Sequence, residues 1–87
     1  MPFFVYIVEC ADKTYYIGST NNIEKRILQH NTKKNGAKYT KGRRPVTLRF
    51  FEKHETLHDA LVRENQLKKL TRNKKTHLIT KSKTSHF

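Results

Sequence analysis

FFVYIVEC, residues 3–10, and TYYIG, residues 14–18, decide the fold of this 87-residue chain. Both stretches are rich in β-branched and aromatic side chains, which is typical of β-strands. The polar segment between them is only three residues long, which suits a tight turn. The sequence therefore predicts a β-hairpin at the start of the chain.

The residues after the hairpin predict a helix, a third strand and two further helices. Several residues of 19–22 can cap a helix over about 23–30. The later pattern predicts a strand over 46–51, a helix over 57–70 and a short helix over 74–80. The order β-β-α-β-α-α indicates an α+β domain in which helices cover a three-stranded sheet. We expect this domain to take residues 1–80, with 81–87 as a flexible C-terminal tail.

The composition indicates a small basic domain. The chain has 19 Lys and Arg against 7 Asp and Glu, a net charge of +12, and is 34% hydrophobic. No apolar run approaches the ~18–20 residues of a membrane span. Such an excess of positive charge repels itself unless an anionic partner is present. We expect nucleic acid rather than a membrane, since no segment has the long two-faced pattern of a membrane-surface helix. The alternative is a domain that is merely basic.

The cellular compartment is suggested by a single cysteine. Cys10 has no second cysteine with which to form an internal disulfide, and this suits a reducing environment. The first ten residues contain Pro2 and Glu9 and lack a preceding cationic segment, unlike a signal peptide. We therefore expect a cytoplasmic protein.

Residues 33–45 (KKNGAKYTKGRRP) are a basic segment with six Lys or Arg and no acidic residue. Such a loop can follow a phosphate backbone, and its tyrosine can stack on an exposed base. The alternative is a solvated loop without a partner. The predicted nucleic-acid contacts are Lys33, Lys34, Lys38, Tyr39, Lys41, Arg43 and Arg44.

Two residue pairs could carry chemistry. Tyr6 and Tyr16 lie on the two hairpin strands, where facing rings could equally be cross-strand packing. Arg26 and His30 are four residues apart and so share one face of a helix. An ordinary surface pair is the alternative for these two.

Glu64 interrupts the apolar pattern of the second predicted helix. At about 100° per residue it falls between Leu57, Ala60 and Leu61, near the centre of the expected buried stripe. A carboxylate buried there needs a compensating partner. Lys68, four residues on, could form an ion pair, and a metal ion or a cationic cluster at the sheet is the alternative.

These positions combine into one recognisable pattern. It consists of Val5-Tyr6 and Tyr16-Ile17-Gly18, then Arg26, His30 and Glu64, with the stretches GAKYTKGRRPV, ALVREN and LKKLTRNKKTHLI. Over about residues 3–80 the chain resembles the GIY-YIG nuclease superfamily, and most of all its short stand-alone bacterial branch of uncharacterised proteins. The resemblance implies a three-stranded antiparallel sheet flanked by helices.

The resemblance also implies a catalytic site made of Tyr6, Tyr16, Arg26, His30 and Glu64, converging in one pocket open to solvent. Glu64 would hold one divalent ion, Mg²⁺ or Mn²⁺, and Arg26 would bind the scissile phosphate. Tyr6 or His30 would help to deprotonate the attacking water, while Tyr16 would orient water or phosphate. Arg26 and the metal would lower the pKa of Tyr6, whereas His30 has a suitable ordinary pKa.

The chain departs from the family pattern in three places. Phe4 stands where the first motif has its first Gly, and Ser19 stands where some relatives carry a Lys that assists the metal-bound water. Thr76 stands where several relatives place an Asn. We expect a metal-dependent endonuclease that hydrolyses DNA with low sequence specificity, directed by a homodimer, a targeting partner protein or a feature of the DNA. The alternative is a non-catalytic nucleic-acid-binding module on the same scaffold.

HETLH, residues 54–58, matches the zinc-protease pattern H-E-x-x-H. That pattern works only when both histidines lie on one helix face. Because we expect Thr56 to cap the helix, His54 should fall outside it. We interpret the match as a loop-to-helix junction, and a single cysteine argues against a zinc finger.

Overall fold

Three strands and three helices make up the part of the chain that the computed structural model describes, residues 2–32 and 42–82. In chain order they are β1 (Phe3–Glu9), β2 (Tyr15–Thr20), α1 (Ile23–Asn31), β3 (Thr47–His54), α2 (Leu57–Lys68) and α3 (Arg72–Ser82). This order confirms the predicted α+β class and the predicted element sequence. None of the helices in these ranges is both long and apolar enough to cross a membrane.

β1 is the central strand of an antiparallel sheet with the order β2-β1-β3. The hairpin register places Tyr6 opposite Gly18 on β2, and on the other side Tyr6 pairs with Phe51 of β3. β2 pairs with β1 alone and is therefore an edge strand. The predicted antiparallel sheet is confirmed, and its register brings the two halves of the tyrosine motif side by side.

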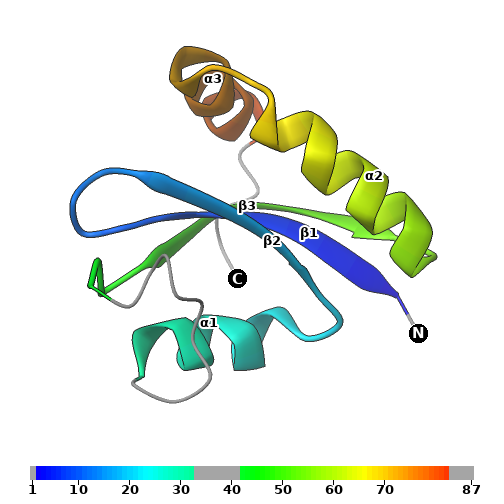
Figure 1. Cartoon of the computed structure of the whole chain (residues 1–87), viewed down its shortest axis with the longest axis horizontal. Coiled ribbons are helices and arrows are strands. Elements are labelled where there is room, and N and C mark those ends of the chain that lie inside the picture. The colour runs from blue at the N-terminus through cyan, green and yellow to red at the C-terminus, as the bar shows by residue number, and fades with distance from the viewer. Residues whose placement is uncertain (1, 33–41, 83–87) are drawn as a thin grey trace.

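Helices cover both faces of the sheet, with α1 on one face and α2 and α3 on the other (Figure 1). Side chains alternate along β1 between these two layers. Val5 and Ile7 join Ala60 of α2 in one buried cluster. Tyr6 belongs to the second cluster, on the α1 side. The alternation along one strand thus decides which helix each candidate residue can meet.

The helix ends differ from the prediction for local reasons. α3 begins earlier than expected because the Thr71 hydroxyl accepts a hydrogen bond from the Lys74 amide at 3.3 Å, which caps the helix. It continues through Lys81 and Ser82, the first two residues of the predicted tail. Residues 83–87 lie outside the described part of the chain.

The buried face of α2 is also displaced from the predicted one. Ala60 and Leu67 are fully buried, whereas Leu57 and Leu61 are 47% and 45% exposed. The buried face therefore lies about 70° around the helix from Leu57. The predicted stripe through Leu57 and Leu61 is wrong, because the helix face that carries Ala60 and Leu67 packs on the sheet instead. Glu64 consequently lies at the margin of the buried face instead of its centre.

Candidate active site

α1 is held in place at both ends. The Asn22 side chain accepts the Lys25 amide at 3.1 Å and caps its first turn. Asn31, in the last turn, exchanges two hydrogen bonds with the backbone of Val46, at 2.7 and 3.1 Å. This tie fixes α1 against the start of β3. Arg26 and His30, one turn apart between these anchors, are thereby directed at the sheet.

Arg26 and His30 meet at the hydroxyl of Tyr6. The Arg26 Nε lies 3.4 Å from Tyr6 Oη, and Tyr6 Oη lies 2.9 Å from His30 Nε2. A guanidinium only donates, so Arg26 donates to the phenol oxygen. The phenol can donate in turn to Nε2 when the neutral imidazole carries its proton on Nδ1. The result is a hydrogen-bond chain of three residues, which we call the tyrosine relay.

The tyrosine relay is uncharged at its two buried members. Tyr6 and His30 are each 1% exposed. Burial raises the pKa of Tyr6 to about 12, and the hydrogen bond and charge of Arg26 offset only part of this effect. Burial and the charge of Arg26 lower the pKa of His30 to about 4. Arg26 does lower the pKa of Tyr6, as expected, but burial outweighs this effect. The expectation that His30 would keep its ordinary pKa is wrong, because burial lowers it.

Tyr16 completes an aromatic cluster around the relay. Its ring centroid lies 5.2 Å from that of His30 and 6.4 Å from that of Tyr6. Gly18 follows on the same face of β2, where a Cβ would stand 2.5 Å from Tyr6 Oη. The glycine of the second motif is therefore required by the close approach of the phenol.

Glu64 is held on the other side of β2. Ser19, the neighbour of Gly18, points toward α2 and donates to Glu64 Oε1 at 2.5 Å. The Lys68 ammonium lies 2.7 Å from Glu64 Oε2. The ion pair with Lys68 is thus present, and it is one of the two alternatives that the sequence offered for Glu64. The contact with Ser19 was not predicted, although its alternation with Gly18 along the strand is a usable signal.

The five predicted residues gather around β2 but do not share one open pocket. Tyr6, Tyr16, Arg26 and His30 lie on the α1 face, whereas Glu64 approaches from the α2 face. The two groups still interact, since the charge of Glu64 contributes to raising the pKa of Tyr6. Tyr6 and His30 are buried, which corrects the expectation of a pocket open to solvent. The two groups thus lie on opposite faces of the edge strand β2 and interact electrostatically across it.

Glu64 and Ser19 together offer the hard oxygen donors that Mg²⁺ and Mn²⁺ prefer. A single carboxylate suits an ion that keeps most of its waters. Across residues 2–32 and 42–82 no group of three or more His, Cys, Asp or Glu could hold a metal ion. The donor set therefore fits a hydrated hard cation and does not fit zinc. Lys68 already occupies one carboxylate oxygen and would compete with such an ion.

Thr76 and the HETLH stretch, which the sequence singled out, make contacts that stabilise the fold. Thr76 on α3 hydrogen-bonds to Tyr15 Oη at 2.8 Å, which ties α3 to β2. Thr56 caps α2 by accepting the Asp59 amide at 3.1 Å, as predicted. His54 lies at the end of β3 and pairs with Glu52 at 2.8 Å. The HETLH stretch is therefore a strand-to-helix junction.

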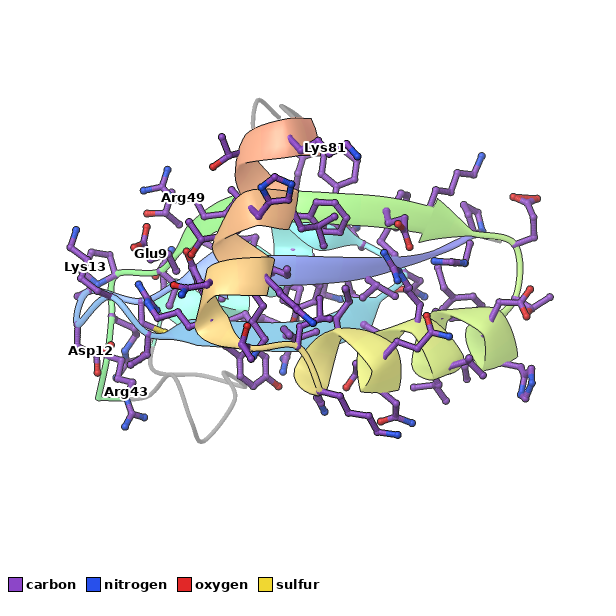
Figure 2. All side chains as sticks on the ribbon, turned by 90° about the horizontal axis from the view of Figure 1, so that it is seen from above. Glu9, Asp12, Lys13, Arg43, Arg49 and Lys81 are labelled. Atoms are coloured by element: carbon purple, nitrogen blue, oxygen red, sulfur yellow. The ribbon has the colours of Figure 1, made fainter. Side chains whose placement is uncertain are left out.

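The described residues include only 42–45 of the basic segment. Arg43 Nε pairs with Asp12 in the hairpin turn at 2.9 Å (Figure 2). Arg44 donates to the carbonyl of Thr32 at 2.5 Å. These contacts tie the segment to the sheet, and nucleic-acid binding by Arg43 and Arg44 stays a prediction. The other predicted contacts, Lys33, Lys34, Lys38, Tyr39 and Lys41, lie outside the described residues.

Comparison with known proteins agrees with this arrangement. The profile of the GIY-YIG catalytic domain matches residues 2–77. The chain belongs to the GIY-YIG nuclease family. Within that family its relatives are UPF0213 proteins. One from Syntrophus aciditrophicus is 55% identical over 76 residues, covering 87% of each chain. UPF0213 protein YazA from Bacillus subtilis is 48% identical over 82 residues, covering 94% of this chain and 82% of the relative.

Two solved structures have folds similar to the one described here. The solution NMR structure of a UPF0213 protein from Bacillus halodurans matches with a TM-score of 0.58 and 38% identity, covering 92% of this chain and 84% of that one. That of a protein from E. faecalis matches with a TM-score of 0.62 and 34% identity, covering 100% and 93%. The family assignment and the single-domain branch inferred from the motifs are thus confirmed. GIY-YIG membership supports a phosphodiester hydrolase in general terms.

Proposed function

We propose that this protein is a metal-dependent endonuclease that hydrolyses DNA phosphodiester bonds with low sequence specificity. The tyrosine relay carries the proposal: a cation, a phenol and a neutral imidazole are linked by hydrogen bonds on a nuclease scaffold. Such a chain can accept a proton at one end and pass another along its length.

The chain's own residues divide the work. As the attacking water adds to phosphorus, Tyr6 Oη accepts the water proton and gives its own proton to His30 Nε2. The phenol stays neutral in this exchange, and the guanidinium of Arg26 stabilises the negative charge that builds up on the phosphate. Tyr16 keeps the imidazole in place by ring contact. A divalent ion at Glu64 and Ser19 would stabilise negative charge on the leaving oxygen.

A second candidate is a nucleic-acid-binding module without turnover. It is favoured by one observation: both oxygens of Glu64 are engaged, one by Ser19 and one by Lys68. A carboxylate held in this way is already compensated without a metal. The two candidates differ in whether a divalent ion can displace the lysine.

A cleavage assay separates the two candidates. Labelled single- and double-stranded DNA is incubated with the protein, with and without Mg²⁺ or Mn²⁺. The Glu64→Ala variant is compared with Glu55→Ala, which removes a carboxylate that is 81% exposed. We expect metal-dependent cleavage by the wild type and by Glu55→Ala, and a loss of about 10²-fold or more in Glu64→Ala. Binding without cleavage selects the module, and cleavage that survives in Glu64→Ala refutes the site.

A further inference from the structure

We propose that the exposed face of α3, with the end of α2, binds the phosphate backbone of duplex DNA beside the candidate active site. This inference rests on the proposed function for its DNA and adds the surface that holds it. The binding surface, which we call the α3 surface, is made by Lys69, Lys74, His77 and Lys81. It is distinct from the basic segment 33–45.

The charges of the chain are segregated along the sequence. All seven acidic residues occur at or before Glu64, and the residues after it include seven Lys or Arg and no acid. Five basic side chains earlier in the fold pair with carboxylates, namely Arg43, Arg49, Lys53, Arg63 and Lys68. Among the described residues, by contrast, no carboxylate pairs with Lys69 or with any cation of α3. Within residues 2–32 and 42–82, the positive charge of α3 is thus not compensated by any acidic side chain.

Two of the four Lys and Arg side chains of α3 share one exposed face of the helix with His77, whereas Arg72 lies over the Tyr15 ring. Lys74, His77 and Lys81 follow a spacing of three and four residues, which places them on a single stripe. All three are exposed. The far side of α3 packs on the sheet through Ile79, which contacts the core cluster, and through Thr76 and Arg72, which contact Tyr15; Leu78, beside Lys74, also contacts the core cluster. Figure 2 looks onto this layer, where α3 crosses the strands and Lys81 lies near its C-terminal end.

Folding alone does not account for this charge. The first turn of α3 has cations and no acidic residue. Cations near the N-terminus of a helix oppose its dipole, and each costs about 0.3–1 kcal/mol. Within the described residues, α3 is anchored to the sheet by two partly buried apolar side chains, Leu78 and Ile79. Thr76 and Arg72 add contacts with Tyr15. A polyanion on the outer face would offset the repulsion that the helix otherwise bears.

The α3 surface is continuous with the candidate active site. Lys68 touches Glu64, and Lys69 follows it at the end of α2. On β2, Tyr15 contacts Thr76 of α3, and Ser19 contacts Glu64 of α2. Tyr15 and Ser19 are four residues apart along this strand. Four residues of a strand span about 13 Å, so α3 docks within a few nucleotides of the site. A DNA backbone lying along α3 would therefore reach Glu64.

The chemistry of this surface favours backbone contact over base recognition. Ammonium groups bind phosphate as point charges, and the stripe offers no Phe, Tyr or Trp ring on which an unpaired base could stack. We therefore expect duplex DNA to bind with little sequence preference. The affinity should depend strongly on salt, because each phosphate contact releases bound counterions.

Fluorescence anisotropy with a labelled 20-base-pair duplex in EDTA tests the inference without any cleavage. The variant Lys74→Gln/Lys81→Gln is compared with Lys25→Gln/Lys53→Gln, which removes two exposed lysines from α1 and β3. Both pairs lower the net charge equally, and circular dichroism checks folding. We expect the α3 variant to bind about tenfold or more weakly at 0.1 M salt, and its slope of log affinity against log salt to fall by about 2.

Three outcomes bear on the inference. Equal affinity and slope in the wild type and the α3 variant would overturn it, as would an equal loss in the control variant. If the α3 variant weakens binding while the wild type fails to cleave with Mg²⁺ or Mn²⁺, the inference stands and the proposed nuclease function fails. If the wild type cleaves and the α3 variant binds as tightly as the wild type, the nuclease function stands and the inference fails.

Discussion

The two faces of β2 hold their functional groups in opposite physical states. On the α1 face, Tyr6 and His30 are buried and uncharged, and they exchange one hydrogen bond. On the α2 face, Glu64 is charged, about 14% exposed, and satisfied by a lysine that is itself about half exposed. The dry face is suited to moving a proton, and the wetter face is suited to holding charge. In the proposed mechanism, both groups would act on the same phosphate across this edge strand.

The sharpest test of the dry face is the pH dependence of folding. Because the pKa of His30 is lowered to about 4, from 6.5 in the unfolded chain, acid protonates the unfolded state first. The contribution of His30 to stability is complete above about pH 6.5 and is lost as the pH falls toward 4. The loss amounts to about 3 kcal/mol. Urea unfolding at pH 7 and pH 4 measures it.

Two variants isolate this effect from other groups. His30→Gln keeps an acceptor for Tyr6 and removes the titration, so it should lose about 3 kcal/mol less than the wild type between the two pH values. His58→Gln, at an exposed position on α2, should behave like the wild type. An identical pH dependence in wild type and His30→Gln would show that His30 is not held neutral by burial.

A smaller effect is expected where the two faces meet. Gly18→Ala places a methyl group against the hydroxyl and ring of Tyr6, with its Cβ 2.5 Å from Tyr6 Oη. The buried ring has little room to move, so we expect a loss of about 1–3 kcal/mol in the free energy of unfolding. Gly42→Ala is the matched control, because nothing lies within 4 Å of its added Cβ. Equal stability of the two variants would contradict the close packing of the motif glycine.

The smallest effect concerns the charged face. Lys68→Gln removes the ammonium that competes for Glu64 Oε2, and a partly exposed ion pair is worth at most about 1 kcal/mol. We therefore expect the variant to bind Mn²⁺ more tightly, by up to about fivefold, as measured by electron paramagnetic resonance. Lys53→Gln should leave the affinity unchanged. Weaker Mn²⁺ binding in Lys68→Gln would mean that the lysine supports the ion instead of competing with it.

The sequence predicted what depends on local patterns. The hairpin, the element order and the capping role of Thr56 followed from residue types and spacing, and the hairpin placed Tyr6 and Tyr16 on neighbouring strands. The pKa values of Tyr6 and His30 were not predictable, because burial arises only when α1 docks on the sheet. The same holds for the bond between Ser19 and Glu64. The exposed Leu57 and Leu61 show why periodicity alone misplaced the buried face of α2.

The central claim is that the two faces of β2 form one catalytic site. It is tested most directly by single-turnover DNA cleavage with Tyr6→Phe, Glu64→Gln and the double variant. Residues that act as a unit are non-additive, so the double variant should be within about threefold of the slower single variant. A double variant slowed by the product of the two single effects would contradict the claim, as would single variants that cleave at the wild-type rate.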